Sequence, residues 1–169
     1  MGGIGIRLDE ETVLPGLAAM ARNLEDATPL WDDVGRFLVL RFQEHFEAQR
    51  DPEGNPWKPS RRALAQGGAT LRDTGRLYAS LTHNAWKSGV EAGTNVEYAI
   101  AHQTGMTIRA KTAKGLFIRF RPAGANKDEI RRPQQVTLPR RAFIGINDDD
   151  ADEIMAIAAR YAEGLFHAQ

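Results

Sequence analysis

The sequence predicts one α+β domain spanning residues 1–169, in which a small, mostly antiparallel sheet with hairpins is packed by about three helices. The first observation is that apolar residues recur at helical spacing in three segments. The second is that short segments of alternating apolar and polar residues are joined by turns, as in β-hairpins. The third is size, because 169 residues of which 42% are hydrophobic suffice to bury one core.

The first expected elements are a strand and two helices. Residues 4–8 alternate between apolar and small or polar side chains and predict a short strand, and a helix is expected over residues 13–24. The clearest helix starts with Thr28 as its expected cap and stops before Pro52, because the residue before a proline avoids helical angles. Its broad apolar face comprises Leu30, Val34, Phe37, Leu38, Phe42 and Phe46.

The middle of the chain predicts short elements. Residues 60–72 are polar and are expected as a loop, and a short helix is expected over residues 73–81. Residues 82–87 and 90–92 predict two strands of a hairpin that turns at a Ser-Gly pair. The stretch "VEYAIAHQTG" predicts one or two helical turns closed by Gly105.

The last third of the chain predicts a second hairpin and a final helix. The hairpin is expected to pair residues 107–111 with residues 116–121, and a mobile polar loop is expected over residues 122–135. A strand resumes at residues 136–138. The final helix is expected to have Asn147 or Asp148 as its cap and Ile154, Ile157, Ala158, Tyr161 and Leu165 as its buried stripe.

Charge is unevenly distributed along the chain. There are 22 basic and 22 acidic residues, but residues 109–141 hold ten Lys or Arg against Asp128 and Glu129, so this stretch is +8 and the rest is −8. This asymmetry predicts contact with an oppositely charged surface, either nucleic acid or another copy, and a solvated face is the alternative. The basic hairpin and loop at about 107–135 are its centre. The expected contact residues are Arg109, Lys111, Lys114, Arg119, Arg121, Arg131, Arg132, Arg140 and Arg141.

No motif for catalysis or for cofactor or metal binding is found. Cysteine is absent, which excludes disulfides and thiolate chemistry. The four histidines do not have metal-binding spacing, and the motifs GxSxG, GxGxxG and GxxxxGK[ST] are missing. No apolar run suggests a membrane segment, and no secretory leader is visible. We therefore expect no enzyme, no catalytic residue, no cofactor, no bound metal and no membrane contact.

Four motifs follow one another in the chain: "DPEGNPWKP", "LRDTGRLYASL", "VEAGTNVEYAIAHQTG" and "LPRRAFIGINDDDADEI". In this order and spacing they resemble the phage virion morphogenesis family, the tail-completion proteins of Mu-like and P2-like tailed phages, over roughly residues 28–165. The matching positions are Pro52, Gly54, Trp57, Leu71, Thr74, Gly75, Leu77, Gly93, Thr94, Tyr98, Ala99, His102, Gln103, Gly105, Pro139, Arg141, Phe143 and Gly145.

The resemblance implies a non-enzymatic structural protein of the virion, made in the bacterial host cytoplasm and placed at the neck or head-proximal tail end. It would complete the tail and join it to the head, as a tail terminator or head–tail joining ring, often of about six copies. Its partners would be other neck and tail proteins, with DNA met only in the lumen. The alternative is a nucleic-acid-binding protein that uses the basic hairpin, with an affinity that falls steeply with salt.

Trp57 lies in a loop stiffened by prolines, including Pro52, which limit the freedom of the unfolded chain. Two interpretations remain open. Trp57 is either a lid on the core at the end of the long helix or an anchor in an interface. The core lid is favoured, because an isolated apolar residue near a helix end is usually buried within its own chain. Gly54, Gly93 and Gly105 are expected at turns, where positive φ is needed or a side chain would clash.

Overall fold

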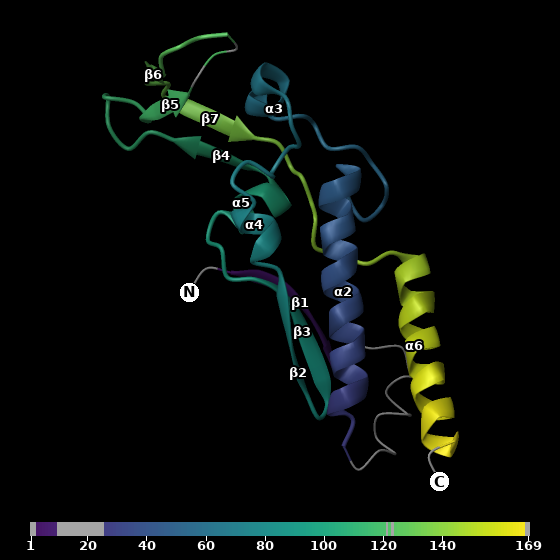
Figure 1. The fold of residues 1–169 in the computed structure, drawn as a ribbon. Coiled ribbons are helices and arrows are strands. Elements are labelled where there is room, and N and C mark those ends of the chain that lie inside the picture. Colours follow the sequence, from purple (N-terminus) through teal and green to yellow (C-terminus); the bar gives the residue numbers. More distant parts are fainter. Residues whose placement is uncertain (1–2, 10–25, 121, 123, 168–169) are drawn as a thin grey trace.

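The fold is built around two long helices and a three-stranded sheet. The computed structural model describes residues 3–9, 26–120, 122 and 124–167, and the helix expected over residues 13–24 falls outside these ranges. The central elements are β1 (Ile4–Asp9), α2 (Thr28–Ala48), β2 (Thr82–Trp86), β3 (Gly89–Thr94) and α6 (Asp148–His167). Helix α2 lies between the sheet, whose strand order is β1-β3-β2, and α6 (Figure 1). The predicted α+β class is confirmed.

Helix α2 carries much of the core on one face. Its fully buried side chains are Leu30, Trp31, Val34, Leu38, Phe42 and Phe46. The predicted apolar face is therefore confirmed, except that Phe37 is only partly buried. Thr28 is not the cap as predicted, because Ala27 precedes the first turn and the Thr28 N–H donates to Asp26 Oδ1 over 2.9 Å. The helix ends earlier than the predicted proline stop, because Gln49 takes a left-handed φ of 55°.

Glycines allow the backbones of the sheet and α2 to come close. The predicted hairpin of β2 and β3 is confirmed, and β1 pairs antiparallel with the other edge of β3. A Cβ on Gly35 of α2 would lie 2.4 Å from the His83 ring of β2. A Cβ on Gly93 would lie 2.2 Å from the Ile4 carbonyl oxygen of β1. Gly93 is thus required where a side chain would clash, as predicted, but in a strand and not in a turn.

Short helices lie near the C-terminal end of α2 (Figure 1). They are α3 (Arg61–Gln66), α4 (Arg76–Ala79) and α5 (Ala99–Thr104). Helix α3 replaces part of the expected loop, and it is capped by Ser60 Oγ, which accepts from the Ala63 N–H over 3.1 Å. Helix α4 is shorter than predicted, but Leu77 and Leu81 are buried as expected. Helix α5 is closed by Gly105, whose φ is 73°, as predicted.

A long arm projects from the end of the molecule that carries α5 (Figure 1). It spans residues 106–138 and contains β4 (Met106–Arg109), β5 (Ile118–Phe120), β6 (Glu129–Arg131) and β7 (Gln135–Leu138). Strand β4 pairs with β7, and β5 pairs with β6. The predicted pairing of residues 107–111 with residues 116–121 is therefore wrong. The predicted strand at residues 136–138 is confirmed, whereas the expected loop at 122–135 contains β6.

The pairing error has a local cause in the segment 111–115. The Ala110 N–H donates to the Gln134 oxygen and the Leu116 N–H to the Pro133 oxygen, each over 2.8 Å. The adjacent residues Pro133 and Gln134 therefore accept hydrogen bonds from Leu116 and Ala110, which are six positions apart. Residues 111–115 form a bulge within one long hairpin, not its turn, and the turn lies between β5 and β6.

Helix α6 begins with a reciprocal cap. The Asp150 N–H donates to Asn147 Oδ1 over 2.9 Å, and the Asn147 N–H donates to Asp150 Oδ2 over 3.1 Å, which confirms Asn147 as the cap. Arg41 Nε donates to the buried Asp150 carboxylate over 2.5 Å and so ties α6 to α2. Ile154 and Ala158 are buried as predicted. Within the described ranges, no helix is both long and apolar enough to cross a membrane.

Candidate functional site

The loop after α2 places Trp57 in the core. Gly54 takes the positive φ expected of it, 84°, in a turn where its N–H donates to the Asp51 oxygen over 2.9 Å. Trp57 is only 6% exposed and stands edge-on to Phe46, with the ring centroids 5.5 Å apart. Its indole N–H donates to the Ala142 oxygen over 2.9 Å. Trp57 is therefore the core lid that the sequence favours, and the interface-anchor interpretation is wrong.

Phe46, near the C-terminal end of α2, is where three of the four sequence motifs meet. Its ring contacts Trp57, Tyr78 and Phe143, at centroid distances of 5.5, 5.9 and 4.9 Å. Each of these rings comes from a different motif. Aromatic pairs of this kind stabilise a core beyond the area they bury. The motif residues thus hold distant segments of the chain on one helix end.

Gln103 of α5 joins the remaining motif to the same place. Its Oε1 accepts from the N–H groups of Phe143 and Ile144 over 2.9 and 3.1 Å, and its Nε2 donates to the Ile144 oxygen over 2.5 Å. His45 of α2 donates from Nδ1 to the Phe143 oxygen over 2.9 Å. Among the described strands none pairs with Phe143 and Ile144, so side chains satisfy these backbone groups. The sequence marks Gln103 as a motif position, but no local pattern indicates that its side chain bonds this segment.

Arg141 does not lie on the predicted contact surface. It is 5% exposed, its Nε donates to the Lys58 oxygen over 2.7 Å, and its backbone N–H donates to the His102 oxygen over 2.7 Å. Its burial lowers the pKa of the guanidinium. The prediction of Arg141 as a subunit contact is wrong, because it holds the Trp57 loop against the segment before α6.

These contacts make a rigid base for the arm. The chain enters the arm after Gly105 and leaves it before Pro139. A Cβ on Gly105 would lie 2.9 Å from the backbone nitrogen of Arg140, so the two ends of the arm are in close contact. Beyond this point, Gly145 packs against Pro52, where a Cβ would lie 2.7 Å from Pro52 Cγ. The motifs therefore position the arm, and we take the arm as the candidate site.

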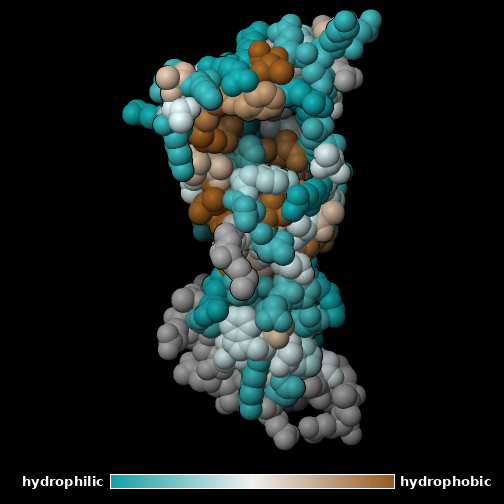
Figure 2. All heavy atoms as spheres, turned by 90° about the vertical axis from the view of Figure 1, so that its left-hand side faces the viewer, coloured by the Kyte–Doolittle hydropathy of each residue, from teal (hydrophilic) through white to brown (hydrophobic). Residues whose placement is uncertain are grey.

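The arm exposes several large apolar side chains. In β4 and β7 the apolar residues fall on one face, because Met106 is paired with Leu138 and Ile108 with Val136. Figure 2 shows hydrophobic side chains gathered in the upper half of the face on which the arm lies. A cluster of this kind marks an interaction site. The exposed large apolar residues of the arm and α5 are Tyr98, Ile100, Met106, Ile108, Phe117 and Ile130.

The predicted basic residues differ in how they are engaged. Arg119 is paired with Asp128 over 2.9 Å and Arg131 with Glu129 over 3.7 Å, and the Arg132 guanidinium lies 5.6 Å from the centre of the Phe117 ring. Arg109, Lys111 and Lys114 on the arm are exposed, and the structure gives them no ion pair with a described carboxylate. Arg140 at the base is also exposed, and its charge acts on the Asp51 carboxylate. Arg121 falls outside the described residues.

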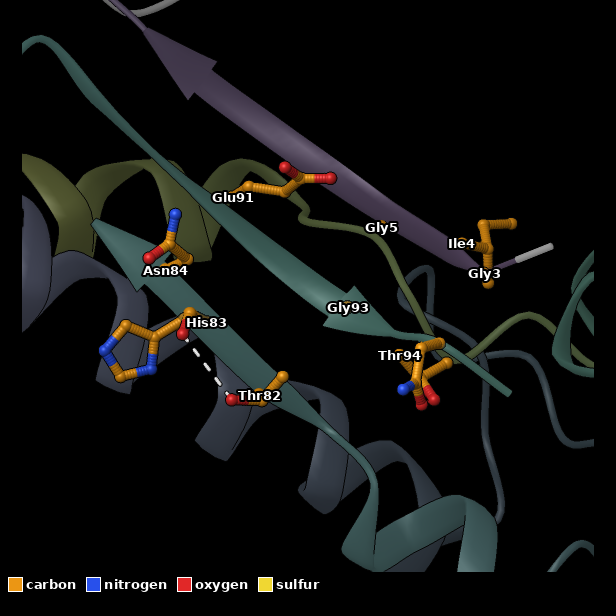
Figure 3. A pocket seen from close by; sticks show the side chains of 10 residues that line it. Gly3, Ile4, Gly5, Thr82, His83, Asn84, Glu91, Gly93 and Thr94 are labelled. Carbon is orange, nitrogen blue, oxygen red and sulfur yellow. Dashed lines mark hydrogen bonds between the residues drawn. The ribbon is translucent and has the colours of Figure 1, made fainter. Parts of the chain in front are cut away.

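A shallow hollow of about 370 Å³ lies on the sheet face turned away from α2. Gly5 of β1 and Gly93 of β3 lie side by side there, and Glu91 borders them (Figure 3). His83 points instead toward α2, where its Nε2 is 2.8 Å from Asp32 Oδ1. The two titratable residues of the lining are therefore on opposite faces of the sheet. The hollow brings together no acid–base pair.

His102 of α5 makes the stability of the arm's base dependent on pH. Burial lowers its pKa, and the charge of Arg141 lowers it further. The unfolded chain, whose histidines titrate near about 6.5, then binds more protons than the native chain below that pH. The free energy of unfolding should therefore be highest above about pH 6.5 and should fall as the pH is lowered below that value. Urea unfolding of the parent and of His102→Gln at several pH values measures this. A difference in the free energy of unfolding between the two proteins that does not change with pH would contradict the expectation.

Comparison with known proteins agrees with the motif pattern. The family model described as the phage virion morphogenesis family matches residues 8–163. No match is found among the curated proteins or among the solved structures. Because the family model covers most of the chain, this chain belongs to the phage virion morphogenesis family. It is thus a phage virion morphogenesis protein, and the arm and its base are features of such a protein.

Proposed function

We propose that this chain is a non-enzymatic structural protein that forms a ring at the neck of the particle, where it completes the tail and joins it to the head. The arm is the surface through which it contacts neighbouring copies and the adjoining neck and tail proteins. DNA meets the ring only as it passes through the lumen. The resemblance suggests about six copies, since closed rings are the usual result when one contact repeats around an axis.

The observation that carries this proposal is the arm itself. An isolated two-stranded ribbon is only marginally stable in water, and large exposed apolar side chains are usually covered by a partner. The arm of this chain is such a ribbon, with Met106 and Ile108 exposed. Its base is held by aromatic and hydrogen-bonded contacts, so the arm is presented in a fixed place. A rigid base with an uncovered arm is suited to assembly.

Phage that lack this chain are expected to accumulate heads and tails that are not joined, or tails with defective ends. The reason is that a ring at the neck is needed to close the tail and to attach it. Negative-stain electron microscopy of lysates measures this, and supplying the parent chain from a plasmid is the control that should restore whole particles. Antibody against the chain should label the neck. Normal infectious particles without the chain, or labelling far from the neck and tail end, would show the proposal to be wrong.

A nucleic-acid-binding function predicts a different result in solution. Its affinity for duplex DNA would fall steeply between low and physiological salt, because binding would release counterions from the phosphates. Under the proposed function the chain should show no such binding at physiological salt. Fluorescence anisotropy with a labelled duplex measures this directly.

A further inference from the structure

The apolar face of the arm is bordered by cations at both ends. Lys111 and Lys114 lie on the bulge that follows β4, and Arg140 lies at the base beyond β7. All are exposed. A surface that covers this face should therefore have an apolar centre with carboxylates beside it, because complementary charge favours one partner and one orientation. Met106 and Ile108 are 42% and 39% exposed, so nothing in the described part of the chain covers them fully.

One place on the body has the required complement. Ile146 is 38% exposed and precedes Asn147, the cap of α6, and the first residues of that helix, Asp148 and Asp149, are exposed. We call residues Ile146, Asp148 and Asp149 the acidic corner. Its backbone is fixed by the reciprocal bonds between Asn147 and Asp150. The acidic corner is therefore rigid, apolar at its centre and negative beside it.

Two other exposed apolar residues of the body, Leu64 and Leu40, fit less well. Leu64 lies in α3 after Arg61 and Arg62. Arg62 is paired with Asp73, so the exposed Arg61 gives these surroundings the same sign as the arm. Leu40 of α2 is followed by Arg41, whose guanidinium is paired with both Glu44 and Asp150. The carboxylates near Leu40 are thus already neutralised. Of these three places, charge complementarity favours the acidic corner.

We propose that the arm of one copy docks on the acidic corner of a second copy of this chain. The inference rests on the proposed function, since the copies that meet are those of the ring. The two surfaces are different, so each copy offers one arm and one corner and the contact repeats head to tail. Exposed ion pairs are individually weak, so the charges orient the copies while Met106, Ile108 and Ile146 form the apolar centre.

A charge exchange tests the contact in the full chain. The arm variant is Lys111→Glu with Lys114→Glu, and the corner variant is Asp148→Lys with Asp149→Lys. Each variant alone should lose self-association, because like charges then face each other. The mixture of both should regain it, because each arm then meets a corner of opposite charge. Sedimentation velocity at matched concentrations measures this, with circular dichroism to confirm that each variant is folded.

The matched control carries Lys87→Glu with Arg160→Glu. Both cations are exposed, Lys87 in the turn between β2 and β3 and Arg160 in α6, where it is paired with Glu153. This control should associate like the parent. Equal loss of association in the control would show that net charge and not the contact matters, and would overturn the proposal. A mixture of folded arm and corner variants that fails to associate would overturn it as well.

A cross-link tests the same contact without charge reversal. Because the chain has no cysteine, Ile108→Cys with Ile146→Cys gives a specific pair. A short bismaleimide should join copies of this variant into ladders, both at high concentration and in phage particles, whereas Leu40→Cys with Ile108→Cys should not. No ladder in either setting would overturn the proposal. If antibody still finds the chain at the neck in that case, the proposed function stands without this contact. Cross-linked ladders of a chain that antibody finds outside the neck would support the contact but contradict the proposed function.

Discussion

Trp57→Ala is expected to lower the free energy of unfolding by about 3–5 kcal/mol, the usual cost of removing a large aromatic side chain from a core. The mutation removes the edge-on contact with Phe46 and leaves a cavity at the C-terminal end of α2. It also removes the indole N–H from the Ala142 oxygen, which loses its partner inside the core. Urea unfolding followed by circular dichroism measures the change.

Trp86 provides the matched control. It lies at the end of β2, is only partly buried, and its indole N–H donates to the Ser88 hydroxyl two residues away. Trp86→Ala should therefore cost clearly less than Trp57→Ala. Trp57→Phe should fall between the parent and Trp57→Ala, because it keeps a ring against Phe46 but loses the hydrogen bond. Equal costs for the two tryptophan-to-alanine variants would contradict the role of Trp57 as a lid.

The elements that the sequence predicts best are those whose signals are local. The apolar face of α2, the hairpin of β2 and β3, the end of α5 at Gly105 and the Asn147 cap are each encoded within a few residues. Helix α3 also carried a local signal, the serine cap at Ser60. The sequence nevertheless does not predict this helix, because none of its six residues is buried and so no apolar face marks it.

The strand pairing of the arm could not be predicted, because it depends on contacts between residues that are far apart in the sequence. Both "KTAKG" and "PAGANKD" have the composition of a turn. Which of them closes the hairpin depends on hydrogen bonds between residues more than twenty positions apart, such as Ala110 with Gln134. Local composition does not distinguish a bulge from a turn when both contain glycine.

The burial and contacts of single polar residues could not be predicted from the sequence either. Arg141 has the same identity as its neighbour Arg140, but only Arg141 is buried. Its place is set by the carbonyl oxygens of Lys58 and His102, which reach it from distant segments. Charge counting therefore placed Arg141 with the surface cations. A pattern of residue types shows where charge is present, whereas the fold decides which charges face solvent.

Gln103 also stabilises the base of the arm, through hydrogen bonds where Trp57 acts mainly through packing. Its side-chain amide satisfies two backbone N–H groups and one carbonyl oxygen of Phe143 and Ile144, both of which are buried. None of the described strands pairs with this segment, so no strand in the described residues supplies these bonds in place of the amide. A buried donor or acceptor that loses its partner costs about 1–3 kcal/mol, and three are affected together, although water can reach part of the space.

Gln103→Ala is therefore expected to lower the free energy of unfolding by roughly 2–4 kcal/mol and to speed hydrogen exchange at the Phe143 and Ile144 amides. Urea unfolding and hydrogen-exchange mass spectrometry measure the two effects. Gln134→Ala is the control, because the Gln134 amide bonds only the exposed Ala113 oxygen on the arm, and such surface changes usually stay within about 0.5 kcal/mol. If exchange at Phe143 and Ile144 stayed slow in a folded Gln103→Ala variant, the segment before α6 would be held by the aromatic cluster alone, and the arm would not depend on this amide for its position.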